Sequence, residues 1–316
     1  MPETPRMIVL DEPRHRCLCS GTCCQGLYVE VGDEARARIE DIAAQLGVDT
    51  PIVEGGVRFD NGQCVFLGDD LLCNIHREHG GEAKPLTCQQ FPFVAIETET
   101  EHRAGIDPAC SSAWRTWRNG PRLVPEQLHT RLRTLNPPEQ HAERAIISAA
   151  SQPGMTVAGL LHLICAGRPG SDLPPGFASR WVRRLVAADL PAFLDRPDTG
   201  HALRAHLGGV ARAVEGLDPN APPEWPVLDP EWDAFAVEVT RRMLFLRLAP
   251  LIPSVMGVAL LTLGGTLACA WANADPEHFG PALAGWARAI RFRAVWQAIT
   301  PDAETMRWLA TGQPAS

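Results

Sequence analysis

The stretch that decides the N-terminal fold is Arg16-Cys-Leu-Cys-Ser-Gly-Thr-Cys-Cys-Gln25, in which four of ten residues are cysteine. Eight of the ten cysteines in the chain lie in its first 110 residues, and they are Cys17, Cys19, Cys23, Cys24, Cys64, Cys73, Cys88 and Cys110. Thiolates from one short loop and three later segments can close a metal site only where the chain folds back on itself. The sequence therefore predicts that metal binding and folding of this region are coupled.

The N-terminal segment and the net charge indicate where the protein is located and which partners it binds. The segment from Met1 to Met7 has neither the apolar run nor the small-residue cleavage site of a secretion signal. We therefore expect a cytoplasmic, reducing location, where clustered cysteines indicate metal binding or catalysis rather than disulfides. The formal net charge of −8 gives no basic surface for phosphate neutralisation, so no nucleic-acid partner is expected.

The first third of the chain predicts short strands and tight turns. Asn61-Gly62 between apolar runs is a strong hairpin signal, and it places Cys64 beside the turn. A strand at 71–75 would put Cys73 next to Cys64, where knuckle-like turns present sulfur to a metal while backbone N–H groups face the thiolate. The other elements expected here are a strand at 27–31, a helix at 34–46, a short helix or loop at 76–84, and a hairpin of 93–98 with 102–106.

From about Trp114 the apolar spacing changes to helical periodicity. Helices are expected at 125–135, 138–151, 157–166, 175–194, 201–215, 230–248, 254–273, 276–299 and 303–310. Proline or an N-cap residue stands near most of their starts. The predicted class is therefore α+β, with a small irregular cysteine-cluster module of short hairpins over 1–113 and a larger all-α domain over 114–316.

One uncharged stretch, 250–274, is long enough to cross a bilayer. It contains two prolines and three glycines, and helices of ordinary amphipathic spacing flank it. The favoured interpretation is a helix buried in the helical domain, so no membrane partner is expected. Cys165 and Cys269 lie in apolar helical stretches and are expected to be buried structural thiols rather than ligands.

The cysteine cluster can hold more than one kind of centre. Zinc takes four Cys or His ligands, and iron–sulfur clusters also take thiolates, so eight cysteines suffice for one site with spare thiols or for two sites. Cys23 and Cys24 are adjacent, so either a sharp turn converges them or they serve different sites. His15, His76 and His79 are available as extra ligands, although histidines in such polar stretches are more often exposed. The chain has no Cys-x-x-Cys redox pair.

The spacing of these motifs resembles that of the YkgJ-type cysteine-cluster family, which is described as zinc- or iron-chelating. The segments that carry the resemblance are Cys17 to Cys24, Cys64-Val-Phe-Leu67, Cys73-Asn-Ile-His76, Lys84-Pro-Leu-Thr-Cys88, Phe91-Pro92 and the closing Cys110. The family opens with Cys-x2-Cys-x2-Cys-Cys, and Cys17, Cys23 and Cys24 fall on its first, third and fourth positions. Ser20 holds the second position, with Cys19 displaced by one. We expect seven ligands, with Cys19 as an alternative or extra one: Cys17, Cys23, Cys24, Cys64, Cys73, Cys88 and Cys110.

The order of motifs is also similar to the N-terminal part of flagellin lysine N-methylases, through Cys23-Cys24-Gln-Gly26 and the later Cys-x-Phe-Leu and Cys-x-Ile segments. That resemblance implies an iron–sulfur cluster, S-adenosylmethionine and methyl transfer to protein lysines. Two functions are therefore expected: a zinc or iron–sulfur centre that is chiefly structural, or a protein lysine N-methyltransferase whose helical domain shapes the substrate cleft. A third is that the helical domain binds a partner protein while the metal staples the platform.

Overall fold

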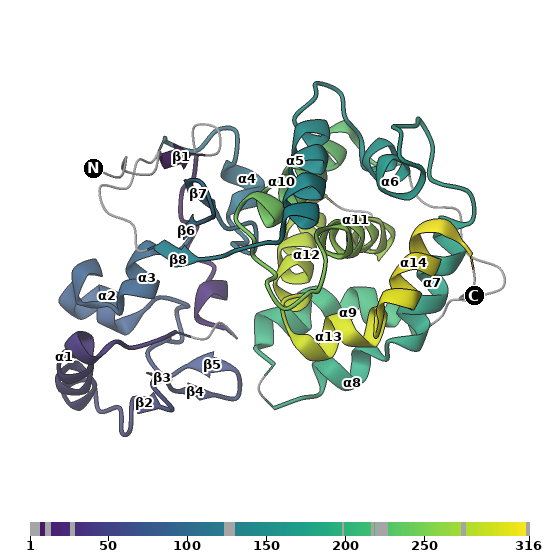
Figure 1. Cartoon of the computed structure of the whole chain (residues 1–316). Coiled ribbons are helices and arrows are strands. Elements are labelled where there is room, and N and C mark those ends of the chain that lie inside the picture. The colour runs from purple at the N-terminus through teal and green to yellow at the C-terminus, as the bar shows by residue number, and fades with distance from the viewer. Residues whose placement is uncertain are drawn as a thin grey trace, which may run out of the picture.

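The computed structural model describes residues 7–9, 14–25, 29–122, 130–197, 199–215, 218, 227–272 and 276–313. Figure 1 shows a smaller N-terminal region of short strands and helices beside a larger helical region. The predicted α+β class, with a cysteine-bearing region of short strands followed by a larger helical part, is confirmed.

A sheet with the strand order β1-β7-β6-β8 joins the two regions. The predicted hairpin is confirmed as β6 (Phe93–Glu97) and β7 (His102–Ile106), which pair antiparallel. β1 (Met7–Val9) adds to β7 in parallel, and β8 (Thr130–Leu132) adds to β6 in parallel.

The helix predicted at 125–135 is wrong where the structure describes it. Residues 125–129 lie outside the described residues, and the rest of that segment begins with the strand β8. The backbone groups of β8 are satisfied by pairing with β6, and Arg133 N donates to Glu97 O at 2.8 Å directly after it. A tertiary partner thus overrides the local helical pattern. The domain boundary at residue 113 stays a prediction, and the sheet takes this strand from beyond it.

A small core supports the cysteine-bearing region. α1 (Asp33–Gln45) begins and ends within one residue of the predicted helix 34–46 and buries Ile39, Ile42 and Ala43. These side chains pack in one cluster with Val57, Phe66 and Ile75. The predicted apolar stripe therefore forms the centre of this core.

The Asn-Gly hairpin is also confirmed, as β4 (Phe59–Asp60) and β5 (Gln63–Cys64). Asn61 and Gly62 have φ values of 50° and 76°, the left-handed pair that a tight two-residue hairpin requires. A Cβ on Gly62 would lie 2.7 Å from the backbone of Gly200, so this turn rests directly against the helical region. The remaining elements here are β2 (Ile52–Val53) paired with β3 (Gly56–Val57), α2 (Asn74–His79), η2 (Gly81–Ala83) and α3 (Leu86–Gln90).

Two strand predictions have different outcomes. For the strand at 27–31, residues 27 and 28 lie outside the described part, and Glu30 forms a bridge with Gly56. The strand at 71–75 is wrong, because α2 begins at Asn74 and only a single bridge, Leu67 with Cys73, precedes it. Asn74 N donates to Phe66 O at 2.8 Å, and this bond turns the chain into the helix.

The helical region is built around α11 (Val255–Ala272), which lies among α5, α9, α10 and α12 in Figure 1. The other helices are α4 (Ala113–Thr116), α5 (Pro137–Ala150), α6 (Val157–Ala166), α7 (Phe177–Ala187), α8 (Leu190–Leu194), α9 (His201–Glu215), α10 (Pro230–Phe245), α12 (Pro276–Ala289), α13 (Arg293–Ile299) and α14 (Ala303–Thr311). The predicted helices at 157–166 and 201–215 match in full.

Two predicted helices are each split in the structure. The segment 175–194 forms α7 and α8 because Asp189 takes a φ of 47° and its side chain accepts from Ala192 N, which starts a new helix. The segment 276–299 forms α12 and α13 because Phe292 is extended, with a φ of −80° and a ψ of 128°. Apolar periodicity runs across both breaks, so it could not locate them.

α11 is long and apolar enough to cross a membrane, with a mean hydropathy of 1.8, and 83% of it is buried inside the protein. The predicted buried helix at 254–273 is thus present within one residue of its expected bounds. Two adjacent glycines allow large rings to pack on it: a Cβ on Gly264 would meet Trp181, and one on Gly265 would overlap Trp286. α11 packs as the core helix that the other helices cover.

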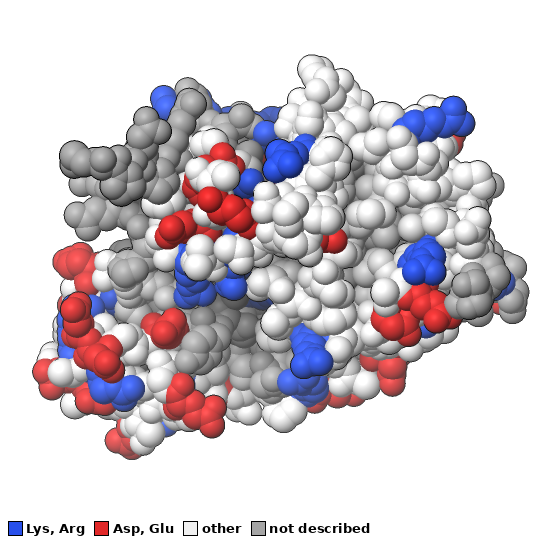
Figure 2. All heavy atoms as spheres, viewed as in Figure 1, with Lys and Arg blue, Asp and Glu red and all other residues white. Residues whose placement is uncertain are grey.

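The charged side chains show no large basic surface in the view of Figure 2. Acidic and basic groups lie there in small groups of either sign. The expectation that nucleic acid is not a partner stays a prediction.

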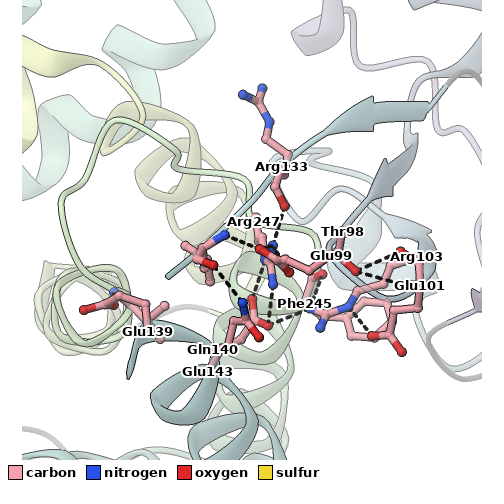
Figure 3. Close-up of polar contacts among 12 residues, drawn as sticks. Thr98, Glu99, Glu101, Arg103, Arg133, Glu139, Gln140, Glu143, Phe245 and Arg247 are labelled. Atoms are coloured by element: carbon pink, nitrogen blue, oxygen red, sulfur yellow. Dashed lines mark hydrogen bonds and ion pairs between the residues drawn. The ribbon is translucent and has the colours of Figure 1, made fainter. Parts of the chain in front are cut away.

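A buried ion network connects the sheet to the helices (Figure 3). Glu143 of α5 lies between Arg103 of β7, at 2.9 Å, and Arg247, at 2.8 Å. Arg247 also contacts Glu99 of the β6–β7 turn at 3.0 Å. Since Glu143 is 1% exposed, its two guanidinium partners replace the water that the carboxylate loses.

We expect Gly265→Ala to lower the free energy of unfolding by about 1–3 kcal/mol, because a Cβ there overlaps the buried Trp286 ring. Urea denaturation would measure it. Gly208→Ala in α9 is the matched control, since its Cβ would meet only the end of the Arg212 side chain, and it should stabilise by roughly 0.5–1 kcal/mol. Equal effects of the two changes would contradict the packing of α11 described here.

We expect Glu143→Gln to destabilise the protein by about 3–5 kcal/mol, since it leaves two buried guanidinium groups without their shared carboxylate. Glu40→Gln removes an exposed partner of Arg36 and should change the unfolding free energy by less than about 0.5 kcal/mol. Denaturant unfolding at neutral pH compares the two variants, and a Glu143→Gln protein as stable as the control would refute the network's role.

Candidate metal centre

The Cys17 to Cys24 loop ends in a single 3-10 turn, η1 (Thr22–Cys24). Gly21 enters the turn with a φ of 67°, in the left-handed region that glycine adopts without strain. The turn brings the Sγ atoms of Cys23 and Cys24 to 3.8 Å from each other. Of the two alternatives that the sequence left open, the structure has the sharp turn that converges the adjacent thiols.

Three hydroxyl groups tie this loop to the segment that follows Cys110. Ser111 Oγ lies 2.7 Å from both Ser20 Oγ and Thr22 Oγ1, and these two are 2.9 Å from each other. The first and last cysteine segments of the cluster are therefore held side by side by a closed triangle of hydrogen bonds.

Cys64 and Cys73 lie at the two ends of a tight turn. Leu67 N donates to Cys64 O at 2.9 Å, and Leu67 bridges to Cys73, which is the N-cap residue of α2. The backbone N–H of Phe66 donates to the Cys64 sulfur. This is the predicted knuckle-like arrangement, in which amide groups face a thiol, although Cys73 precedes a helix rather than lying in a strand.

Cys88 lies in the short helix α3, directly after Lys84 and Pro85. Pro85 O accepts from Cys88 N at 2.8 Å and from Gln89 N at 3.0 Å, so the proline residue starts the helix that carries the thiol. Lys84 places a positive charge near this thiol and near Cys23. These bonds fix the approach of the chain to Cys88.

The adjacent thiols Cys23 and Cys24 have opposite pKa shifts. Their mutual hydrogen bond lowers the pKa of Cys23 to about 6, and the positive charges of Arg288 and Lys84 act in the same direction against burial. The same hydrogen bond, together with burial, raises the pKa of Cys24. At neutral pH the pair therefore holds one thiolate beside one thiol.

The charge of Cys23 reaches thiols from the other segments. Burial raises the pKa of Cys64 and of Cys88 to about 12, and the charge of the Cys23 thiolate acts in the same direction on both. We call Cys23, Cys24, Cys64, Cys73 and Cys88 the inner set. All five are partly exposed free thiols that act on one another electrostatically.

Cys17 and Cys19 form an outer pair, since both are exposed. Cys19 has a φ of 54°, and its backbone N–H donates to Cys17 Sγ at 3.4 Å. Neither belongs to the inner set, so the fold does not favour one of them over the other as the ligand for the first position of the motif.

His15 differs from its expected exposure. The prediction that it is exposed is wrong, because it is 3% exposed and its Nε2 lies 3.3 Å from Cys110 Sγ. Burial, with the charge of Arg242, lowers the pKa of His15 to about 4, so its imidazole is neutral at pH 7. His76 is exposed and His79 half-buried. Sequence spacing gave no signal for the His15–Cys110 contact, because the two residues meet only through the tertiary fold.

The eight predicted ligands are all free thiols. Within the described ranges, no three Cys, His, Asp or Glu side chains stand in the closed arrangement of a metal site. The inner set is therefore a group of neighbours rather than a finished tetrahedron, and the ligand assignment stays a prediction. Cys269 is fully buried, as expected for a structural thiol, whereas Cys165 is partly exposed and packs against the helical core.

The cysteine-bearing region also matches a known protein-family model. Residues 15–111 match the CxxCxxCC family model, described as a "Putative zinc- or iron-chelating domain". The matched residues contain all eight cysteines and end at the Ser111 hydroxyl triangle. No curated protein and no solved structure matches the chain.

The residues of this matched region fit a thiolate-bound metal. Zinc–sulfur bonds of about 2.3 Å in a tetrahedron place two sulfurs about 3.8 Å apart. The Cys23–Cys24 separation of 3.8 Å equals that edge. The Phe66 N–H at Cys64 and the Cys19 N–H at Cys17 give sulfur the amide contacts typical of metal thiolates.

The helical region holds the matched region 15–111 through α12. Arg288 is 3% exposed and donates to Thr22 O at 2.5 Å, Gln25 O at 2.7 Å and Ala109 O at 3.0 Å. It therefore grips both sides of η1 and the residue before Cys110. Sequence reasoning missed Arg288, and the available signal was a single charge among apolar neighbours in Trp286-Ala-Arg-Ala-Ile290.

Asp107 and Arg291 form a second link. Arg291 Nη2 lies 2.6 Å from Asp107 Oδ1, and Nη1 lies 2.8 Å from Oδ2. Burial raises the pKa of Asp107, but the charge and hydrogen bonds of Arg291 outweigh it and hold the pKa below its usual range. The carboxylate is therefore ionised and stabilises the fold at neutral pH.

We expect Asp107→Asn to lower the unfolding free energy by about 3 kcal/mol at pH 7, because it leaves Arg291 without its charged partner. The folded-state pKa of Asp107 is depressed, so its contribution is present above the unfolded pKa of about 4 and is lost as pH falls below it. The difference between wild type and variant in urea unfolding should therefore shrink from pH 7 to pH 3. A difference that stays constant would rule out this pair.

Proposed function

We propose that the chelating domain binds one zinc or iron centre through thiolates of the inner set. The observation that carries this proposal is the 3.8 Å separation of Cys23 Sγ and Cys24 Sγ, at the hub of thiols from three other segments. Cys64, Cys73 and Cys88 supply the further ligands. The outer pair and Cys110 are spare donors at its edge.

The geometry of the adjacent pair favours certain centres over others. Two thiolates at a tetrahedral edge bind the same ion, as in a zinc site or in a two-iron cluster whose four cysteines are shared between two irons. A four-iron cluster with four cysteines takes one thiolate per iron. We therefore place zinc and two-iron centres ahead of a four-iron one.

The centre stabilises a region whose own core is small. The apolar cluster under α1 consists mainly of short aliphatic side chains and Phe66, and the cysteine segments around it are loops and single turns. A bound metal supplies bonds between these segments, so part of its binding free energy becomes folding free energy. The chain's contribution is to converge the sulfurs and to direct N–H groups and cations toward them.

A second candidate function is the one that the resemblance implies, a protein lysine N-methyltransferase that depends on an iron–sulfur cluster. It requires a place for S-adenosylmethionine beside the centre. A cavity of about 280 Å³ between β8, α10 and α11 and another of about 390 Å³ near α13 and α14 have no cysteine in their linings. We rank the chelating function first, because the matched family model describes chelation. Tritiated S-adenosylmethionine retained by the purified protein would reverse that ranking.

Single Cys→Ser changes in the inner set should remove the metal. We expect Cys24→Ser and Cys64→Ser to lower the metal content of anaerobically purified protein at least about tenfold and to lower its unfolding free energy, since metal binding and folding are coupled. Elemental analysis for zinc, iron and sulfide measures the content. Cys165→Ser is the matched control, because that thiol packs against the helical core, and it should keep the wild-type metal content.

The double change Cys17→Ser with Cys19→Ser separates the inner set from the outer pair. We expect this exposed pair to be replaceable with little loss of metal. A wild-type protein without zinc or iron would overturn the proposed function. Loss of metal in the Cys17/Cys19 variant alone would move the site to the loop entrance.

A further inference from the structure

The buried side chain of Arg288 is more than a structural link. Its donors reach three backbone carbonyl oxygens, Thr22 O, Gln25 O and Ala109 O, which flank Cys23, Cys24 and Cys110. Carbonyl groups accept hydrogen bonds from any donor of the right shape and do not neutralise a charge. The guanidinium therefore brings a full positive charge to the cysteine loops without a carboxylate of its own in these contacts.

The neighbouring charges leave this excess in place. Asp107 is the carboxylate that acts most strongly on Arg288, but both of its oxygens already contact Arg291, at 2.6 and 2.8 Å. Two arginines and one aspartate carry a net charge of +1. Arg288 is 3% exposed, so water does not screen this charge.

A buried unpaired cation is costly unless an anion lies close to it. The three carbonyl groups that Arg288 contacts belong to Thr22, Gln25 and Ala109, which are the chain neighbours of Cys23, Cys24 and Cys110. These thiols would become anionic thiolates on binding a metal. Lys84, in the cysteine-bearing region itself, is the other cation that acts on Cys23. The buried charge of Arg288 adds to it from α12, at the place where metal-bound thiolates would gather.

We propose that Arg288 is the buried counter-ion of an anionic, thiolate-rich metal centre in the chelating domain. This inference rests on the proposed function and goes beyond it, since it selects the class of centre. Zinc with three or four thiolates, or a two-iron cluster with four, carries a net negative charge that the guanidinium offsets. Zinc with two thiolates and two neutral imidazoles is uncharged and would leave Arg288 without a partner.

Arg288 is therefore a positioning and charge-balancing residue that lies outside the matched residues 15–111. It acts on the centre through the loop backbone and through space, and it does not bind the metal. The helical region then takes part in metal binding, because α12 adds a buried charge to that of Lys84 in the cysteine segments.

The test compares Zn²⁺ affinity in the full-length wild type and three variants, by competition with a chromogenic chelator. Arg288→Met removes the charge and the hydrogen bonds, and we expect its affinity to fall by about 10–100-fold. Arg288→Lys keeps the charge but cannot span three carbonyl groups, and we expect it to stay within about threefold of wild type. Arg184→Met is the matched control, because Arg184 also donates to two carbonyl oxygens, Ile299 O and Ala298 O, but lies in α7 among helices.

The order of the Zn²⁺ affinities distinguishes a counter-ion role of Arg288 from a role in which it only holds the loop backbone. Loss of affinity in Arg288→Lys as large as in Arg288→Met would overturn the counter-ion role and leave only a backbone clamp. Equal affinity of Arg288→Met and wild type would overturn the inference while leaving the proposed function in place. Failure of the wild type to bind Zn²⁺ or iron would remove both. If Arg288→Met does not fold, Arg288→Gln takes its place as the variant that removes the charge, and equal affinity of Arg288→Gln and Arg288→Lys would overturn the counter-ion role.

Discussion

The contact on which the rest of the structure depends is the grip of Arg288 on the backbone of the cysteine loops. Its three short hydrogen bonds hold η1 from both sides and connect it to the segment before Cys110. The loop has little apolar surface of its own to bury, so hydrogen bonds from a rigid helix replace the missing hydrophobic packing. α12 is rigid in turn because it packs against α11, α9 and α10.

Two further buried ion links join the sheet to the helices. In the first link, Glu143 of α5 contacts Arg103 of β7 and Arg247, which follows α10. In the second, Asp107, directly after β7, contacts Arg291, directly after α12. Buried pairs of this kind add little net stability, but removing one partner leaves an uncompensated charge. They therefore fix how the two regions dock more than they hold them together. The glycine contact between Gly62 and Gly200 brings the backbones of the two regions close at the same junction.

The cysteine region takes a different route to stability from the helical region. In the helices, large rings such as Trp181 and Trp286 fill the space above Gly264 and Gly265, and the core is continuous. In the cysteine region the apolar cluster is small, and thiols from separate segments stand beside it. Metal–sulfur bonds between these segments would supply the cross-links that a small core lacks. This division explains why one chain contains both a thiol-rich irregular part and an ordinary helical core.

The sequence by itself determined the class of fold, the Asn61-Gly62 hairpin, the β6–β7 hairpin, and most of the helices, because turn chemistry and apolar periodicity are local properties. The matched cysteine motif is also a property of the sequence, because it is defined by the spacing of cysteines along the chain. Only the tertiary structure decided the rest. Residues 130–132 form the strand β8 rather than part of a predicted helix because they pair with β6. The chain enters α2 at Asn74 rather than continuing as a strand because Asn74 N donates to Phe66 O. The burial of His15 beside Cys110 and the reach of Arg288 to the cysteine loops depend on residues far apart in sequence, whose contacts no local pattern encodes.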